Sequence, residues 1–387
     1  MRILHIIPTY LPAMRYGGIT RSVHSLCSSL VKRGHKVHVY TTNVDGSKNS
    51  NVPLGKAVDL QGVTVHYFNC SLFRNFYHSP SMKEELLKTV REFDLLHIHS
   101  IYRWPTWAAA RIAEHAKIPY VLSPRGMLVK ELVRRKSKWV KLIWLQFIEK
   151  RTIENAAGIH VTSELEAQEI GRFGFRLPKV SIVPNGCEIE VQNSEPNGMQ
   201  PEIEEVIKRK PELLFLGRIN WKKGLDRLIL SLTHVPNVYL VIAGNDEDDY
   251  QPVLEKLAKR HGVLDRIRFV GPVYGPAKIK LMESATLFVL PSYSENFGNA
   301  VLEAMSAGCP VVVTPEVGLA ATIKASGAGV VVEGDPIKLG QSIKELLSNK
   351  QRLQQMGEAG KKIVHQRFAY SLIAKEMEEV YMALIHI

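Results

Sequence analysis

The chain has 387 residues, 45% of them hydrophobic and 23% charged, a balance that indicates a folded globular protein and excludes a disordered one. Its length exceeds that of one ordinary hydrophobic core, so two domains are expected. The formal net charge is +12, and residues 1–193 carry all of this excess, with 27 Lys and Arg against 15 Asp and Glu. Such a basic half leaves three classes of partner open: nucleic acid, an anionic membrane and an anionic substrate.

No stretch of the chain has the pattern of a membrane span or a secretory signal. No window reaches the roughly 18 to 20 apolar residues of a spanning helix. The apolar run after Arg2 is short and is interrupted by His5 and Pro8, so it predicts a first buried strand. The four cysteines show no metal or redox spacing and lie in or beside apolar segments, which favours a reduced, cytoplasmic protein.

Strand and helix patterns alternate through the first half of the chain. A β-rich run at 2–8, a helical segment opened by Gly17 and Gly18, and a strand at 36–42 imply a parallel sheet. The glycine pair lets the backbone approach a ligand closely, but the G-x-G-x-x-G spacing of a dinucleotide site is missing. Further strands are predicted at 63–68, 94–99, 119–124, 157–162 and 180–184.

The alternation stops between residues 187 and 205, where Asn, Pro, Gly and Ser accumulate. We therefore predict a first domain over residues 1–190, a linker over 191–204 and a second α/β domain over 205–370, with an amphipathic helix at the end of the chain. Two Rossmann-like, doubly wound parallel-sheet domains are expected to face each other across a cleft. Ligands bind such sheets beyond the carboxyl ends of their strands.

The stretch 292–310 follows one apolar strand pattern and precedes another. Glu295 is predicted in the turn after the strand, and Glu303 one to two turns into the following helix, at ~3.6 residues per turn. The helix would begin between the two carboxylates, so its free N–H groups would form an anion site there.

Other polar residues are predicted at the ends of strands in both domains. Arg218 and Lys223 are cations five residues apart, suited to a diphosphate leaving group. His97 and His99 lie two apart on one strand and therefore share a face; we expect His97 to be packed and His99, nearer the strand end, to be functional. Arg125 follows another strand. The set has no Ser–His–Asp pattern, so hydrolysis by a nucleophilic triad is not expected.

The acidic run at 246–249 resembles an Asp-x-Asp metal site, but a hydrophilic loop that enters a helix explains it better. We predict neither a metal nor a cofactor.

The segment 130–151 carries eight Lys and Arg against two Glu, together with Trp139 and several aliphatic residues. It predicts peripheral contact with an anionic membrane; the alternative is a helix whose apolar side is core. No specific nucleic-acid binding is expected, because no recognition fold is evident.

Several of these motifs, in this order, are similar to those of a known family. Over nearly its whole length the chain resembles the retaining glycosyltransferases of family four, which have the GT-B fold, and in particular the bacterial enzymes of surface-polysaccharide synthesis. The matching segments are the Gly17-Gly18 loop, 94–99, 123–127, 184–186, 217–224 and above all 295–303.

The resemblance implies a role for each candidate residue. Arg218 and Lys223 would hold the diphosphate, Glu303 the ribose and Glu295 the donor sugar. Phe297, Gly298 and Asn299 would present backbone groups to the sugar, and Ala300 and Val301 to the phosphate. Gly17 and Gly18 would approach the diphosphate, Gly271 would lie by the base, His99 would contact the sugar near the reacting carbon, and Arg125 would help to bind donor or acceptor.

The resemblance also implies an activity and an arrangement of domains. The chain would move a sugar from a nucleoside-diphosphate sugar to a saccharide or lipid-linked acceptor hydroxyl, with retention and without a metal, in polysaccharide, lipopolysaccharide or glycolipid synthesis. The first domain would bind the acceptor, and the helix at 371–387 would pack back on it. The protein would be cytoplasmic, peripheral on the inner face of the plasma membrane. A sugar-nucleotide epimerase or hydrolase and a non-catalytic sugar-nucleotide-binding protein remain alternatives.

Overall fold

The computed structural model describes residues 1–13, 17–70, 73–133, 143–188, 200–247 and 249–385. They form two compact units. Unit 1 comprises Met1–Gly186 together with Tyr370–Ile387, and unit 2 comprises Cys187–Ala369. Each unit is described by itself below.

Unit 1 is built on an eight-stranded sheet with the order β10-β9-β8-β7-β1-β2-β6-β5. The strands are β1 Arg2–Thr9, β2 Lys36–Thr42, β5 Ala57–Leu60, β6 Val63–Phe68, β7 Leu95–His99, β8 Tyr120–Ser123, β9 Gly158–Val161 and β10 Val180–Ile182. All neighbours pair in parallel except β5, which runs antiparallel to β6. A separate small hairpin joins β3 Val44–Asp45 to β4 Lys48–Asn49.

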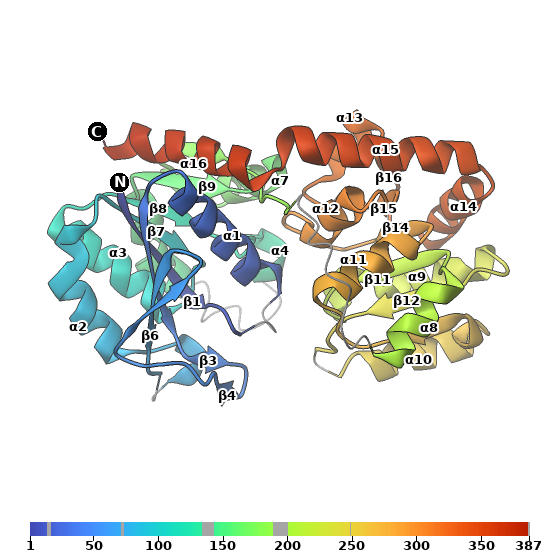
Figure 1. Ribbon diagram of the computed structural model, residues 1–387, viewed down its shortest axis with the longest axis horizontal. Coiled ribbons are helices and arrows are strands. Elements are labelled where there is room, and N and C mark those ends of the chain that lie inside the picture. The colour runs from blue at the N-terminus through green and yellow to red at the C-terminus, as the bar shows by residue number, and fades with distance from the viewer. Residues whose placement is uncertain (14–16, 71–72, 134–142, 189–199, 248, 386–387) are drawn as a thin grey trace. The chain divides into compact units, whose positions relative to one another are not determined.

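Helices cover both faces of this sheet (Figure 1). They are α1 Gly18–Lys32, α2 Pro80–Thr89, α3 Trp104–Ala116, α4 Lys130–Val133, α6 Lys150–Glu154, α7 Glu164–Gly171 and α16 Tyr370–Ile385, with short turns η2 Arg74–Phe76, η3 Val90–Glu92 and η4 Leu145–Glu149.

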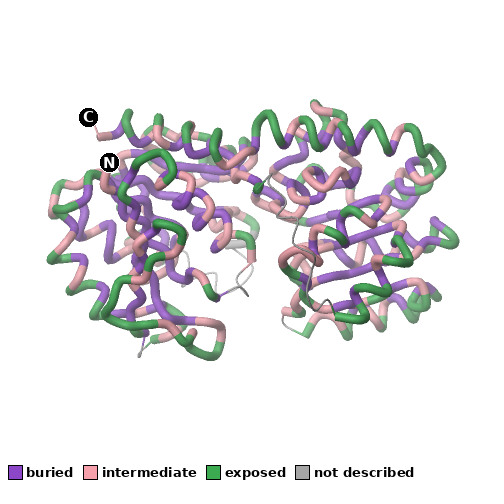
Figure 2. Tube along the Cα trace, viewed as in Figure 1, coloured by how far each residue is buried: buried purple, intermediate pink, exposed green. Residues whose placement is uncertain are grey.

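The period of two along a strand divides the core of unit 1 into two layers. On β1, Leu4 and Ile6 join the cluster that contains α2 and α3. Ile3 and Ile7 join the opposite cluster, which contains α1 and α16. Strand β1 is buried along nearly its whole length, and the purple strands at the centre of unit 1 in Figure 2 show the same burial in its neighbours. Near-continuous burial is typical of a parallel sheet covered on both faces.

Unit 2 is built on a six-stranded, fully parallel sheet with the order β13-β12-β11-β14-β15-β16. The strands are β11 Leu213–Leu216, β12 Leu240–Ala243, β13 Ile267–Phe269, β14 Leu287–Leu290, β15 Val311–Val313 and β16 Gly329–Val331. The helices are α8 Pro201–Arg209, α9 Leu225–Ser231, α10 Gln251–Arg260, α11 Gly275–Ser284, α12 Asn299–Ser306, α13 Ala320–Ser326, α14 Pro336–Leu347 and α15 Lys350–Arg367, with turns η5 Trp221–Lys223, η6 Leu232–His234 and η7 Leu264–Arg266.

Local capping explains where several of these helices begin. The Asp335 carboxylate accepts hydrogen bonds from the N–H groups of Ile337 and Lys338 at 3.1 and 3.0 Å, and Pro336 occupies the first helical position of α14. In unit 1 the Ser163 hydroxyl accepts a bond from the Glu166 N–H at 3.2 Å, which caps the start of α7.

The predicted linker 191–204 is wrong at its carboxyl end. Helix α8 begins at Pro201, and its Ile203 and Val206 side chains are buried in the core of unit 2. Pro201 is the first residue of a helix with Glu202 and Glu204 in its first turn, so the proline that indicated a loop marks a helix start instead. Residues 191–199 of the predicted linker lie outside the described residues.

Both sheets reverse their winding direction at one place. In unit 1 the order reverses between β1 and β7, and in unit 2 between β11 and β14. Connections leave these two neighbouring strands in opposite directions, which opens a crevice at their carboxyl ends where ligands bind in doubly wound sheets. The two switch points therefore locate the candidate sites.

Candidate functional site

The loops after β11 and β14 meet at the switch point of unit 2. The Tyr293 N–H donates to the Lys222 carbonyl at 2.7 Å. Gly224 has φ +66°, and a Cβ at that position would lie 2.0 Å from the Pro291 carbonyl oxygen. Only glycine permits both this backbone conformation and this close approach. The two loops are thus held against each other.

This contact brings together two residues predicted from the sequence. Lys223 forms an ion pair with Glu295, and the side chains are only 17% and 18% exposed. The backbone of Glu295 is held on both sides, since its N–H donates to the Glu316 carbonyl at 3.0 Å and its carbonyl accepts from the Gly318 N–H at 2.9 Å. The carboxylate is therefore presented from a fixed turn.

Helix α12 begins directly after this turn. Gly298 is its N-cap, with φ +104°, a conformation that favours glycine. The Val301 N–H, predicted to face a phosphate, donates to the Gly298 carbonyl at 2.9 Å. Asn299 and Ala300 are the first two residues of the helix, where N–H groups have no intrahelical acceptor. One turn later Glu303 receives a bond from the Lys278 ammonium at 2.5 Å.

The other cation predicted in unit 2, Arg218, is more exposed than Lys223. Its guanidinium donates to Glu247 at 2.8 Å, and Asn220 donates to the other oxygen of Glu247 at 2.9 Å. Asp246 accepts from the N–H groups of Tyr250 and Gln251 at the start of α10. The described part of the acidic run 246–249 therefore pairs with a cation and caps a helix; residue 248 lies outside the described residues.

The remaining predicted residues have structural surroundings of their own. Phe297 is buried against Phe368, and its carbonyl accepts from the Leu319 N–H at 3.1 Å. Gly271 has φ +67° directly after β13, and its carbonyl accepts from the Gly244 N–H at 2.8 Å. In unit 1, Gly17 is the N-cap of α1 with φ +77°, and Gly18 is the first helical residue.

The switch point of unit 1 holds two layers of buried polar side chains, which we call the inner and outer layers. The inner layer is a chain of hydrogen bonds. Tyr381 contacts His97 Nδ1 at 2.6 Å, His97 Nε2 contacts Ser123 at 2.7 Å, Ser123 contacts His160 Nδ1 at 2.7 Å, and His160 Nε2 contacts the Val183 carbonyl at 2.8 Å. The carbonyl only accepts, so each neutral histidine donates toward Val183 and the Tyr381 hydroxyl donates to His97.

The outer layer lies one step closer to the strand ends. Arg125 donates to His99 Nδ1 from Nη2 at 3.1 Å and from Nε at 3.4 Å, and to the Asn185 side-chain oxygen at 3.0 Å. His99 Nε2 contacts His5 Nδ1 at 3.0 Å. A guanidinium cannot accept, so His99 Nδ1 is the acceptor and His99 Nε2 donates to His5.

Both layers keep their histidines neutral. Burial, followed by the charge on Arg125, lowers the pKa of His5 to about 3. The same causes in the same order lower the pKa of His160 to about 3. Burial lowers the pKa of His97 and His99 well below the usual value as well. The His99 ring is fully buried, and both its nitrogens have hydrogen-bond partners within unit 1. A contact between His99 and a donor sugar stays a prediction.

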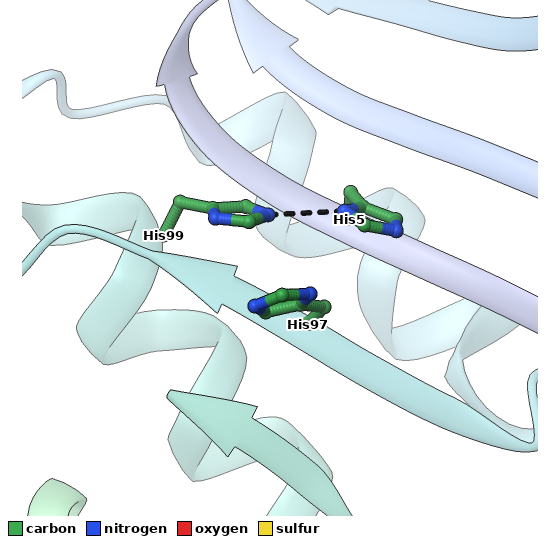
Figure 3. A group of neighbouring side chains, drawn as sticks. All are labelled: His5, His97 and His99. Carbon is green, nitrogen blue, oxygen red and sulfur yellow. Dashed lines mark hydrogen bonds between the residues drawn. The ribbon is translucent and has the colours of Figure 1, made fainter. Parts of the chain in front are cut away.

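His5, His97 and His99 lie close enough to suggest a metal site (Figure 3), with ligand nitrogens within 4.8 Å of one another. Their geometry opposes it. The His5 Nδ1 lone pair already accepts a hydrogen bond from His99 Nε2 at 3.0 Å. Both His97 nitrogens already have partners, and a guanidinium occupies His99 Nδ1.

Sequence reasoning missed the partners of the predicted residues. Lys278, Glu247, His5, Ser123, His160 and Tyr381 are separated from them by 25 to 284 positions. The sequence did place Tyr381 on the apolar side of the last helix, which indicated that it is buried. His5 lies in the predicted first strand, which pairs with β7 and places His5 opposite His97.

Two family models match the chain over most of its length. The model described as Glycosyltransferase Family 4 matches residues 16–191, and the one described as Glycosyl transferases group 1 matches residues 199–363. The chain belongs to the GT-B glycosyltransferases. The resemblance to family four and the predicted fold are confirmed by these matches and by the solved structures below.

Similar proteins span nearly the whole chain. An uncharacterized glycosyltransferase of Methanocaldococcus jannaschii is 28% identical and covers 98% of each chain. A D-inositol 3-phosphate glycosyltransferase of Xylanimonas cellulosilytica is 25% identical over 94% of this chain and 91% of its own. The structure of Anabaena HepE in complex with UDP and glucose has a TM-score of 0.76 at 19% identity, covering 99% of this chain and 100% of that one. Among the described helices of this glycosyltransferase, none has the length and apolar composition needed to cross a bilayer.

Proposed function

We propose that this glycosyltransferase uses a nucleoside-diphosphate sugar and transfers its sugar to an acceptor hydroxyl with retention of configuration, in polysaccharide, lipopolysaccharide or glycolipid synthesis. The observation that carries the proposal is the meeting of Lys223 and Glu295 at the switch point of unit 2, beside the start of α12. The complexes of HepE with UDP and with UDP-glucose support such a donor.

In the proposed donor complex, Lys223 and Arg218 turn from their carboxylate partners to the diphosphate. Glu303 accepts from the ribose hydroxyls, and Glu295, released from Lys223, accepts from the sugar hydroxyls. Cations beside the diphosphate stabilise the charge that develops on it as it leaves. The two cations thus exchange a carboxylate for the diphosphate, and the carboxylates exchange an ammonium for hydroxyl groups, so each charged group keeps hydrogen-bond partners.

The proposed reaction breaks the bond between the anomeric carbon and the diphosphate oxygen and forms a bond from that carbon to the acceptor oxygen. The acceptor approaches on the face that the diphosphate leaves, and its hydroxyl proton passes to a diphosphate oxygen. Unit 1 would bind the acceptor. We propose that His99 acts there through Arg125, as a positioning residue, because its ring nitrogens contact Arg125 and His5.

The test is a thermal-shift screen against UDP, GDP, ADP and their sugars, followed by NMR of the product's anomeric configuration. Stabilisation by one nucleotide and its sugar, and transfer only when an acceptor is present, are the expected results. Consumption of the donor without an acceptor would favour the epimerase or hydrolase alternative. Donor binding without any turnover would favour the non-catalytic one.

Membrane contact through the segment 130–151 is a further part of the proposal. Residues 134–142 lie outside the described residues. Beside them Phe147 is 76% exposed and Ile143 58% exposed, and Trp144 stacks on Phe76 at 5.9 Å between ring centroids. Exposed apolar side chains next to a basic run suit an anionic bilayer. A smaller fraction of Phe147→Ser than of the parent chain should float with anionic vesicles. Equal flotation of the variant and the parent chain would contradict the proposed membrane contact.

A further inference from the structure

Arg125 is a buried cation whose partners are all neutral. Only 9% of the residue is exposed, at the carboxyl end of β8. Its hydrogen bonds go to His99 Nδ1 and to the Asn185 side-chain oxygen. Among the described residues no carboxylate lies within 4.0 Å of its guanidinium, in contrast to Lys223 and Lys278 of unit 2.

Such an arrangement is costly unless something compensates for the charge. Moving a cation out of water costs several kcal/mol, which is why buried charges are normally paired. Neutral acceptors satisfy hydrogen bonds but do not neutralise the charge. Desolvation is accordingly the largest influence on the Arg125 pKa, which it lowers, and the charge on the buried Glu166 carboxylate, beyond ion-pair distance, opposes this effect only in part. A cation kept in this state is characteristic of a binding site, where stability is given up for function.

The position of Arg125 is also closely determined. Arg125 and Gly126 both have left-handed backbone conformations, with φ +56° and +73°. Glu166 fixes this turn, because its carboxylate accepts from the Gly126 N–H at 2.6 Å and from the Thr162 N–H at 2.8 Å. His99, held by His5, fixes the plane of the guanidinium. The cation is therefore pre-oriented before any ligand arrives.

The guanidinium still has donors to offer. Its Nε–H, one N–H of Nη1 and one of Nη2 make the hydrogen bonds described, so two of its five N–H groups have no partner among the described residues. Two N–H groups in one plane match the oxygens of a carboxylate or phosphate. We propose that Arg125 binds an anionic group of a substrate, a phosphate or a carboxylate, which supplies the missing countercharge.

This inference rests on the proposed function only for the source of the anion, which would be either the donor diphosphate or an anionic group on the acceptor. Location in unit 1, which carries most of the basic excess of the sequence, suits an acceptor. Both sources offer the same chemistry to Arg125, so the measurements below separate them.

The first experiment follows the arginine side chains by ¹⁵N NMR in full-length Lys223→Ala during titration with inorganic phosphate. Lys223→Ala weakens the proposed diphosphate site, and Arg125→Lys assigns the Arg125 signal by its loss. The Arg125 signal should shift and saturate. The signal of Arg266, which donates to backbone carbonyls in unit 2, is the internal control and should stay in place. An Arg125 signal that does not move while the protein stays folded would overturn the proposal.

The second experiment supplies the missing countercharge from within the protein. Asn185→Asp places a carboxylate where Arg125 now meets an amide oxygen. Phosphate affinity should fall about tenfold or more, because the new carboxylate competes for the guanidinium, and the melting temperature should rise. If Asn185→Asp leaves phosphate affinity unchanged, Arg125 is not the anion site.

UDP binding to Arg125→Gln identifies the source. Retention of UDP affinity assigns the anion to the acceptor, and a loss of about tenfold or more assigns it to the donor diphosphate. Neither NMR shift nor UDP affinity depends on turnover. A protein that transferred no sugar would refute the proposed function and leave this inference standing.

Discussion

The two switch points handle charge in opposite ways. At the switch point of unit 2 the cations Lys223, Lys278 and Arg218 each have a carboxylate partner at a partly exposed position. At that of unit 1 the histidines are buried and neutral, and among the described residues no carboxylate forms an ion pair with the cation Arg125. Unit 2 is thus suited to exchange charged partners, and unit 1 to hold one cation in a fixed place.

The difference follows from the layers of each fold. The histidines of the inner and outer layers lie on the central strands β1, β7 and β9, covered by α1 and α16, so water is excluded and the neutral form is favoured. The carboxylates of the three ion pairs in unit 2 lie on loops or near helix starts after the strands and are 18 to 36% exposed. Mutations and pH should therefore affect the two sites differently.

The largest effect is expected at the paired cation of unit 2. Lys223→Ala and Glu295→Gln should each lower kcat/KM about 10²-fold or more, since each removes a charge placed at the reacting centre. Steady-state transfer with the donor found by the screen measures this. Lys338→Ala, which breaks an exposed ion pair with Glu333 in the same unit, is the control. Near-normal transfer by both site variants would show that the reaction does not take place at the switch point of unit 2.

Acid should destabilise unit 1 through its neutral histidines. The folded pKa values of His5 and His160 are about 3, so between that value and about 6.5 the unfolded chain binds protons that the folded one does not. The stability that comes from keeping these rings neutral is present above pH 6.5 and is lost as the pH falls. Between pH 7 and pH 5, each of the two histidines should lower the free energy of unfolding by about 2 kcal/mol.

Urea unfolding at several pH values checks this dependence. The slope should be shallower in His160→Gln than in the parent chain, because that variant no longer contains one of the groups responsible. If the free energy of unfolding did not change with pH in this range, the prediction that the buried histidines stay neutral would be wrong.

A smaller effect is expected from Tyr381→Phe, which removes the hydroxyl that donates to His97 at 2.6 Å. The His97 nitrogen is then buried without its donor, at a cost of about 1–3 kcal/mol. Chemical denaturation measures the loss. Tyr274→Phe, whose hydroxyl accepts a bond from Asn245 at an exposed position, should change stability far less. Equal losses in the two variants would show that the inner layer contributes no more than a surface bond.

The smallest effect concerns the exposed pair between Arg218 and Glu247. Glu247→Gln should change stability by no more than about 1 kcal/mol, as is usual for surface ion pairs. It should also raise nucleoside-diphosphate affinity by about two- to fivefold, since Arg218 no longer has to leave a carboxylate. Calorimetric titration tests both the sign and the size. A fall in affinity would mean that Glu247 orients Arg218 for the ligand.

Local patterns in the sequence account for much of this arrangement. The period of two predicted that His97 and His99 share a face, and the turn-then-helix pattern predicted where Glu295 and Glu303 lie. The loop-type composition around Pro201 predicted a linker, whereas this residue begins helix α8. The mainly polar helix α15 was not predicted, because its apolar stripe is weak. The partners of the site residues could not be predicted, since pairs such as His97 and Tyr381 are created only by tertiary folding.

The placement of α16 has a consequence for synthesis. Its Met377 and Tyr381 side chains complete the core beneath β1, yet they are translated after the whole of unit 2. The first half of the chain thus leaves the ribosome with α1 alone on that face of its sheet, and without the Tyr381 side chain that contacts His97. Unit 2 is contiguous and can fold as it emerges. The unit that begins the polypeptide is therefore the last to be finished.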